Sequence, residues 1–170
     1  MKLYTVDRKG TLNPGDICDL VVYDDINPKS LANHVSSMFP GGVSAHGERY
    51  FLQNSAHSTI ISPMLELVFE YVRRSKFPHL PSRFQCMFAM DSVAAANQFK
   101  HQYDCNDAPV YRVESQTTTI KVDMTLLTAQ TVLVTSHFGH LYWSGEKHPE
   151  IEPFWEYLLR CPVTVCERVE

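Results

Sequence analysis

The chain has 170 residues, of which 44% are hydrophobic and 20% charged, a balance typical of a soluble globular protein with one domain over residues 1–170. Its 15 basic and 19 acidic residues give a net charge of −4, which excludes a broad electrostatic footprint for nucleic acid. None of the seven glycines stands in a G-x-G-x-x-G or G-x-x-x-x-G-K-S/T arrangement, so a doubly wound dinucleotide-binding enzyme is excluded.

Strand and helix signals alternate through the first half of the chain. Alternating residues over 2–8 predict a half-buried strand. Asn27-Pro28 is a typical helix start, and Pro40-Gly41-Gly42 is a stop signal. An apolar stripe after Ser62-Pro63 predicts the strongest helix. Together the patterns predict strands over 2–8, 20–23 and 49–52, helices over 28–39 and 62–74, and a loop over 44–58.

The second half predicts a strand-rich region that closes with a hairpin. Residues 85–90 are strongly apolar and predict a central strand, after which Asp91 caps a helix. Further strands are predicted over 110–113, 118–123, 154–159 and 163–168, and further helices over 91–101 and 126–140. This mixture of elements predicts an α+β fold.

The sequence predicts a cytoplasmic protein with no membrane partner. No apolar run approaches the roughly 20 residues that span a bilayer. Charges at Lys2, Asp7 and Arg8 occupy the place of a signal peptide's apolar segment. Five cysteines without a C-x-x-C pair favour reduced thiols. No metal site is expected, because the H-x-x-H pair of His137 and His140 lacks a second pair of ligands.

Arg8 ends the first predicted strand, on the face that it shares with Tyr4 and Val6. Tyr4 and Val6 are expected to face inward, so the guanidinium needs an anion or a carboxylate, because an unpaired buried guanidinium is costly. Its planar donor fork suits a phosphate. An arginine at a strand end can also extend into solvent, and that alternative stays open.

Glu156 lies in a late strand that is apolar on both faces. Phe154 and Leu158 flank it at strand spacing, so the carboxylate is expected on an apolar face. A carboxylate in such a strand is either paired or functional, and a salt bridge with Arg8 is one option.

Three more polar residues carry weaker signals. Ser82 and Arg83 open the predicted central strand, and His46 lies in the predicted loop. A turn serine, a surface arginine and an inert loop histidine are the plain interpretations of these residues.

An arginine closing the first strand, a serine opening a central strand and a glutamate in a late strand resemble, in that order, the arginine–serine–glutamate class of mono-ADP-ribosyltransferases. Residues 3–8 resemble the first strand of cholera- and pertussis-type toxin domains, and residues 155–165 resemble the glutamate strand and its hairpin partner. The runs 39–47, 81–85 and 142–145 resemble small bacterial and phage proteins of unknown function that are related to these transferases.

The resemblance implies a split β-sheet core with peripheral helices, in a toxin or effector that transfers ADP-ribose from NAD to a protein or nucleic-acid acceptor. It implies that Arg8 contacts the NAD phosphates or the adjoining ribose, that Ser82 supports the nicotinamide ribose, and that His46 contacts a ribose. Arg83 would join these NAD-binding residues, and Glu156 would be the catalytic acidic residue.

The sequence departs from the family pattern at two motifs. Residues 82–84 read Ser-Arg-Phe rather than Ser-Thr-Ser, and Phe154 replaces the first residue of a Q/E-x-E motif ending at Glu156. Glu150 and Glu152 supply an E-x-E nearby, so the catalytic glutamate is Glu156, Glu152 or Glu150.

The chemistry suits these residue types. Breaking the nicotinamide–ribose bond passes through an oxocarbenium-like state, which a carboxylate stabilises by accepting a hydrogen bond from a ribose hydroxyl. An arginine holds a pyrophosphate without a glycine loop. Two alternatives stay open: a binding module in which Arg8 and Glu156 pair across a filled cleft, and a nucleic-acid-binding protein that uses Arg73, Arg74, Lys76 and Arg83.

Overall fold

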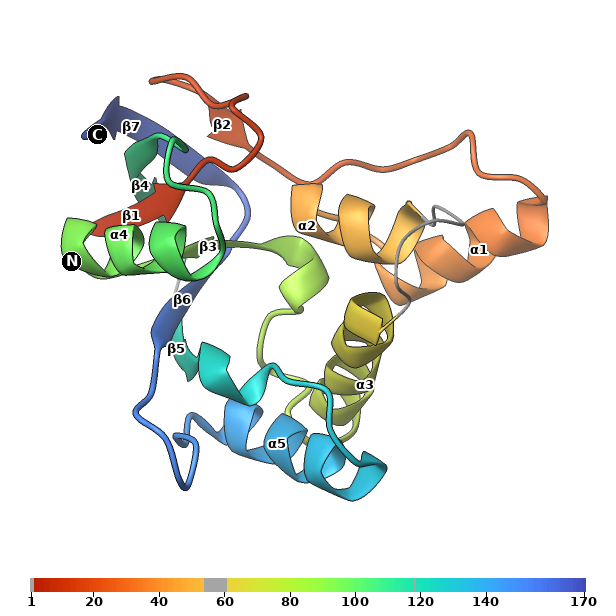
Figure 1. Cartoon of the computed structure of the whole chain (residues 1–170). Helices are drawn as coiled ribbons and strands as arrows, with labels where there is room; N and C mark the ends of the chain where they lie inside the picture. The colour runs from red at the N-terminus through yellow and green to blue at the C-terminus, as the bar shows by residue number, and fades with distance from the viewer. Residues whose placement is uncertain (1, 54–60, 118) are drawn as a thin grey trace.

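The computed structural model describes residues 2–53, 61–117 and 119–170 (Figure 1). Within these residues, seven strands form two antiparallel sheets. The first sheet has the order β1 (Leu3–Val6), β4 (Val110–Ser115), β7 (Val163–Arg168) and β2 (Ile17–Cys18). The second has the order β3 (Cys86–Ala89), β6 (Trp155–Arg160) and β5 (Ile120–Asp123). The fold is α+β, as the sequence predicts.

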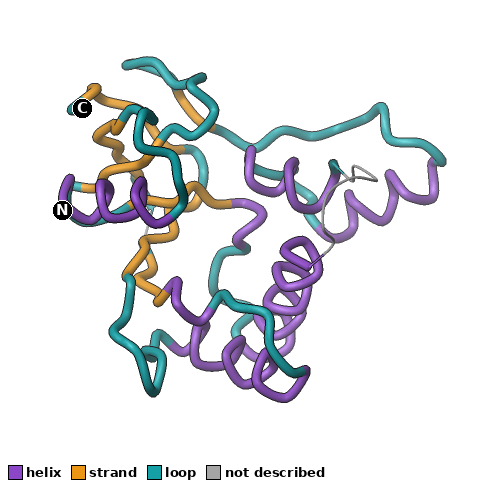
Figure 2. Tube along the Cα trace, viewed as in Figure 1, coloured by secondary structure: helices purple, strands orange, loops and turns teal. Residues whose placement is uncertain are grey.

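Most helical segments lie to one side of the strands, whereas α4 packs against β1 (Figures 1 and 2). The α-helices are α1 (Lys29–Met38), α2 (Ala45–Gly47), α3 (Ile61–Lys76), α4 (Val93–Gln102) and α5 (Val132–Ser144). Shorter turns of helix are the π-helix η1 (Glu48–Leu52) and the 3-10 helices η2 (Arg83–Gln85) and η3 (Met124–Leu126). No helix among the described residues combines the length and the apolar composition needed to cross a membrane.

Strand β6 is the central strand of the second sheet and contributes to the core on both of its faces. It is hydrogen-bonded to β3 on one side and to β5 on the other. Leu158 packs with residues of α3 and α5, whereas Leu159 packs with residues of β1, β4 and β7. The prediction of a late strand that is apolar on both faces is therefore confirmed, and Glu156 lies on the face that carries Leu158.

The two sheets meet at a single backbone bridge. Tyr4 and Met90 exchange N–H···O bonds of 2.8 and 2.7 Å, and Thr5 Oγ1 donates to the Phe88 carbonyl at 2.8 Å. Among the described residues, β1 and β3 share no further ladder. Beyond this bridge, the end of β1, which leads to Arg8, separates from the beginning of β3 at Cys86.

The first strand is shorter than predicted, and its buried face is the opposite one. β1 ends at Val6, and Leu3 and Thr5 are buried, whereas Tyr4 is only half-buried. Arg8 lies beyond the strand, in a turn, and is exposed. The prediction that Arg8 lies on an inward strand face is wrong, because the alternation stops before it.

Two other predicted strands also differ. Residues 49–52 belong to the π-helix η1, and Val21 makes only an isolated bridge to Val43 beyond the short strand β2. The predicted loop over 44–58 is helical from 45 to 52, and its residues 54–58 lie outside the described residues. Ser44 starts this helical segment, since its Oγ accepts a hydrogen bond from the Gly47 N–H.

Elsewhere the boundaries move by a few residues. α4 is capped by Ser92 rather than Asp91, and α5 begins after Thr131, whose Oγ1 accepts from the Val134 N–H at 3.3 Å. The strand predicted to be central, β3, is an edge strand of its sheet, and β6 is central. The last strand has the predicted bounds.

Candidate functional site

A cleft of about 510 Å³ opens where the two sheets separate. Its walls come from the end of β1 and the following turn, from α2 and η1, from α3, from β3 and from β6. This volume is within the range of small-molecule sites in proteins. Four of the five residues predicted for the site line this cleft: Arg8, His46, Arg83 and Glu156.

Glu156 is anchored through one of its two oxygens. Arg83 Nη1 lies 2.5 Å from Glu156 Oε1, and the Tyr142 hydroxyl donates to the same oxygen at 2.9 Å. Arg83 also donates to the Tyr142 oxygen. Burial raises the pKa of Tyr142 well above its ordinary value, so the phenol keeps the proton that it donates. Among the described residues, no group donates to Glu156 Oε2.

Arg83 lies between two carboxylates. Its Nε and Nη2 donate to Glu66 Oε2 and Oε1 at 2.8 and 2.9 Å, while Nη1 donates to Glu156. Arg83 is only 5% exposed and Glu156 only 2%, so water screens these charges weakly. One guanidinium and two carboxylates leave one negative charge at the base of the cleft, unless His46 is protonated.

Helix α3 supplies two carboxylates, one turn apart, that hold the segment before β3. Glu66 holds Arg83, and Glu70 accepts from Ser82 Oγ at 2.8 Å. Glu70 also accepts from Arg73 and Arg74, and it is 1% exposed. Their spacing of four residues puts both glutamates on one side of the helix.

Ser82 is the predicted site residue that the structure does not bring to the cleft. It is buried against Glu70, and its Oγ also caps η2 by accepting from the Phe84 N–H at 3.2 Å. Ser82 therefore fixes the backbone next to Arg83 and does not line the cleft.

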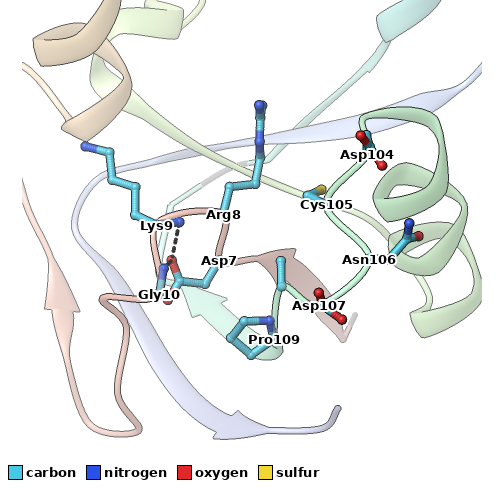
Figure 3. Close-up of a pocket in the computed structure, with 10 residues that line it drawn as sticks. Asp7, Arg8, Lys9, Gly10, Asp104, Cys105, Asn106, Asp107 and Pro109 are labelled. Atoms are coloured by element: carbon cyan, nitrogen blue, oxygen red, sulfur yellow. Dashed lines mark hydrogen bonds between the residues drawn. The ribbon is translucent and has the colours of Figure 1, made fainter.

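Arg8 is presented by a turn that Asp7 organises (Figure 3). The buried Asp7 carboxylate accepts hydrogen bonds from the backbone N–H groups of Lys9, Gly10 and Leu12, at 3.1, 2.9 and 2.8 Å. Arg8 lines the cleft and also a second hollow of about 410 Å³ against residues 104–109 (Figure 3). Among the described residues, Arg8 makes no ion pair, so its guanidinium is available to an anion.

His46 lies on α2 rather than in a loop. Its Nε2 is 3.2 Å from Glu66 Oε1, although the geometry is not that of a hydrogen bond. The ring packs against Tyr50 and Phe88, with centroids 4.5 and 4.6 Å away. Gly47 lets α2 approach η2, because a Cβ on this glycine would lie 2.4 Å from the Phe84 carbonyl oxygen.

The remaining walls are largely apolar, with several aromatic rings and with charged side chains of both signs, since Asp19 and Glu48 also line the cleft. The aromatic side chains are Tyr23, Tyr50, Phe88, Phe99 and Tyr103, and the basic ones beside Arg8 are Lys9 and Arg49. Burial, together with the charge of Glu156, raises the pKa of Tyr103, so its phenol stays protonated. An aromatic cleft with a cationic rim and an anionic base suits a ligand that carries a phosphate, a ring and a cationic centre.

The acidic residues near Glu156 are placed differently. Glu150 and Glu152 are exposed and do not line the cleft, so Glu156 is the one of the three that the fold places at this site. Within the described ranges, no group of three histidine, cysteine or acidic side chains is arranged to hold a metal ion.

Three residues of the site were not predicted from the sequence: Glu66, Tyr142 and Asp7. Glu66 was predicted on the polar side of its helix, and Tyr142 follows the predicted helix over 126–140. The packing of α3 and α5 on β6 brings both to Glu156. Asp7 had a detectable signal, because an aspartate followed three residues later by glycine is common in turns.

No curated protein matches this chain in sequence. A family match covers residues 25–170, which include His46, Arg83 and Glu156, whereas the turn that carries Arg8 precedes them. Because the match covers most of the chain, the protein belongs to the family described as "Protein of unknown function (DUF2441)".

Proposed function

We propose that the protein binds NAD in this cleft and transfers its ADP-ribose group to a protein or nucleic-acid acceptor, releasing nicotinamide. The observation that carries the proposal is the state of Glu156: Oε1 is held by Arg83 and Tyr142, while Oε2 has no donor among the described residues. A carboxylate fixed in this way can accept one hydroxyl from a ligand without reorganising.

The charges of the cleft match those of NAD. Arg8, Lys9 and Arg49 all line the cleft and provide cations for the pyrophosphate. The base of the cleft carries the net negative charge of Glu66, Arg83 and Glu156, which favours the cationic nicotinamide. No glycine-rich loop is needed, because an arginine replaces backbone N–H groups as the phosphate ligand.

The same charges favour bond cleavage over binding alone. As the bond between nicotinamide and ribose C1′ breaks, positive charge moves from the pyridine ring to the ribose. A hydrogen bond from a ribose hydroxyl to Glu156 Oε2 strengthens as that charge grows, so it stabilises the transition state more than the ground state. Arg83 acts as a positioning residue, because its donors are used by Glu66, Tyr142 and Glu156.

The experiment is NAD binding and turnover with three proteins: wild type, Glu156→Gln and Glu152→Gln. Wild type is expected to bind NAD and to release nicotinamide when a cell lysate supplies acceptors. Glu156→Gln removes the charge at constant shape and should slow release by about 10²–10³-fold. Glu152→Gln changes an exposed residue outside the cleft and should behave as wild type. Wild type that neither binds NAD nor releases nicotinamide overturns the proposal.

One observation favours a second candidate, an NAD-binding module without turnover. Arg83 and Tyr142 both donate to Glu156, which reduces the negative charge available to a developing cation. NAD binding without nicotinamide release would favour this candidate. The nucleic-acid-binding alternative has less support, because Arg73 and Arg83 are buried in ion pairs and Arg74 is paired with Glu70.

A further inference from the structure

His46 and Glu66 form a pair beside Glu156 that NAD cleavage does not require. His46 Nε2 is buried 3.2 Å from Glu66 Oε1, and Glu66 is held in turn by Arg83. The His46 side chain is 16% exposed and lines the cleft. Among the described residues, no group forms a hydrogen bond with His46 Nδ1. Unlike Nε2, this nitrogen is not one of the buried side-chain atoms that lack a partner, and the side chain that carries it lines the cleft.

The His46 imidazole is surrounded by side chains from several elements of the fold. Glu66 faces it from α3 and Arg83 lies behind Glu66, while η1 contributes Tyr50 and β3 contributes the uncharged Phe88. Glu48 and Arg49, also on η1, line the same cleft. Among the described residues, Glu66 is therefore the charged group in contact with the ring. A carboxylate behind an imidazole stabilises the ring when it takes up a proton.

We propose that His46 is the general base that deprotonates the acceptor, that Glu66 positions it, and that the acceptor is a hydroxyl group. The inference rests on the proposed function, because it concerns the second substrate of that same cleft. Imidazole accepts protons near neutral pH, and a hydroxyl oxygen attacks well only as its proton leaves. The loose contact between His46 and Glu66 is typical of a catalytic pair that tightens once substrates are bound.

The step balances as follows. The bond between ribose C1′ and the nicotinamide nitrogen breaks, and its electron pair leaves with nicotinamide, which becomes neutral. A lone pair of the acceptor oxygen forms the new C1′–O bond, and the acceptor proton moves to His46 Nδ1. The imidazolium then releases that proton to solvent, so NAD⁺ and R–OH give ADP-ribosyl–OR, nicotinamide and one H⁺.

Two kinds of NAD reaction distinguish a general base for the acceptor from cleavage of NAD itself. Hydrolysis and methanolysis use a hydroxyl acceptor and release a proton. Exchange with labelled nicotinamide uses a neutral ring nitrogen that carries no proton, so it needs no base. His46→Gln should therefore slow hydrolysis and methanolysis by about 10²–10⁴-fold. The ratio of exchange to hydrolysis should rise by on the order of 10²-fold.

Controls distinguish a catalytic role from a structural one. His137→Gln changes an exposed histidine outside the cleft and should keep the wild-type ratio. Added imidazole should restore hydrolysis to His46→Ala, which also covers the case in which His46→Gln folds poorly. Glu66→Gln should slow hydrolysis and methanolysis more than nicotinamide exchange, because the carboxylate that positions the imidazole is lost.

Each outcome decides between the two proposals. A His46→Gln variant that loses exchange and hydrolysis to the same extent, or neither, overturns the general-base role while NAD cleavage stands. Wild type that releases nicotinamide only with the cell lysate, and neither hydrolyses nor methanolyses NAD, overturns the general-base role alone. Wild type that releases no nicotinamide under any of these conditions overturns the proposed transfer, and the general-base role falls with it.

Discussion

Arg83 and Glu156 are 73 residues apart in the sequence, yet Arg83 Nη1 lies 2.5 Å from Glu156 Oε1 and both side chains are buried. The pair links the entry to β3 with the central strand β6. It also gives Glu156 a partner other than Arg8, which the sequence left as one option. The cleft between Arg8 and Glu156 is open as a result, and it is not filled by their ion pair.

Arg83→Ala should strongly destabilise the fold. The substitution leaves Glu66 and Glu156 buried without their counter-charge, and breaking a buried pair in this way costs about 3–5 kcal/mol. Urea unfolding measures the change. Arg160→Ala is the matched control, since Arg160 is exposed, and should stay within about 0.5 kcal/mol of wild type. A cost for Arg83→Ala below about 1 kcal/mol would contradict the buried network.

Ser82→Ala should lower stability without weakening NAD binding. The variant loses the hydrogen bond to Glu70 and the cap on η2, which together cost about 1–2 kcal/mol. Urea unfolding and a calorimetric NAD titration measure the two effects separately. A tenfold loss of NAD affinity at unchanged stability would instead place Ser82 in direct contact with the ligand.

Arg8→Ala should weaken NAD binding without lowering stability. Hydrogen bonds from a charged group contribute about 1.5–3 kcal/mol, equivalent to a roughly 10- to 150-fold rise in Kd. Arg8 is exposed and makes no ion pair with the described residues, so the urea midpoint should not move. Lys147→Ala removes an exposed cation outside the cleft and serves as the control. Equal NAD affinity in all three proteins would remove Arg8 from the site.

Acid should weaken the hold of Glu66 on Arg83. Burial alone would raise the pKa of Glu66, but the charge of Arg83 holds it well below its ordinary value. Such a carboxylate stabilises the fold at pH values above its unfolded pKa, about 4.3, and this contribution is lost as the pH falls towards the folded pKa. Below about pH 5, the free energy of unfolding measured in urea should therefore fall more steeply with decreasing pH for wild type than for Glu66→Gln. If the free energies of unfolding of the two proteins change equally with pH, Glu66 does not contribute to this acid sensitivity.

Gly47→Ala should displace α2, the helix that carries His46. The added Cβ would lie 2.4 Å from the Phe84 carbonyl oxygen and 2.7 Å from Val43 Cβ, so α2 must move away from η2. Overpacking of this kind costs about 1–3 kcal/mol, which thermal or urea unfolding detects. Gly41→Ala is a matched control, because its Cβ would meet Leu20 Cδ1 at an ordinary 3.6 Å. Equal stability of the two variants would show that α2 is not seated as tightly as described.

The sequence predicted which residues of a strand are buried better than it predicted which strands and helices pack against them. Alternation placed Glu156 correctly on a buried face, because β6 is apolar on both sides. Its partner could not be predicted, since periodicity gives the face of a residue and not the strand or helix that covers it. The ladder puts Cys86 opposite Arg160, at the other end of β6 from Glu156. Arg83 reaches Glu156 because its guanidinium lies over the Phe88 ring, 4.5 Å from the centroid.

Short-range hydrogen bonds account for the two local errors. The alternation at the start of the chain was extended to Arg8, although Asp7 already turns the backbone by accepting three N–H groups. Residues 49–52 have strand-forming side chains, yet Ser44 starts a helical segment that continues through them. In both cases a single polar side chain overrides the pattern of its neighbours.

The junction between the sheets has a mechanical consequence. Separating β1 from residues 88–90 breaks three hydrogen bonds among the described residues: the pair between Tyr4 and Met90, and the bond from Thr5 to Phe88. The ladders inside each sheet remain intact, because neither depends on those bonds. Few hydrogen bonds thus join the two sheets, and the buried cluster in which Leu159 packs against β1, β4 and β7 holds them together. The width of the cleft between Arg8 and Glu156 is therefore set mainly by side-chain packing.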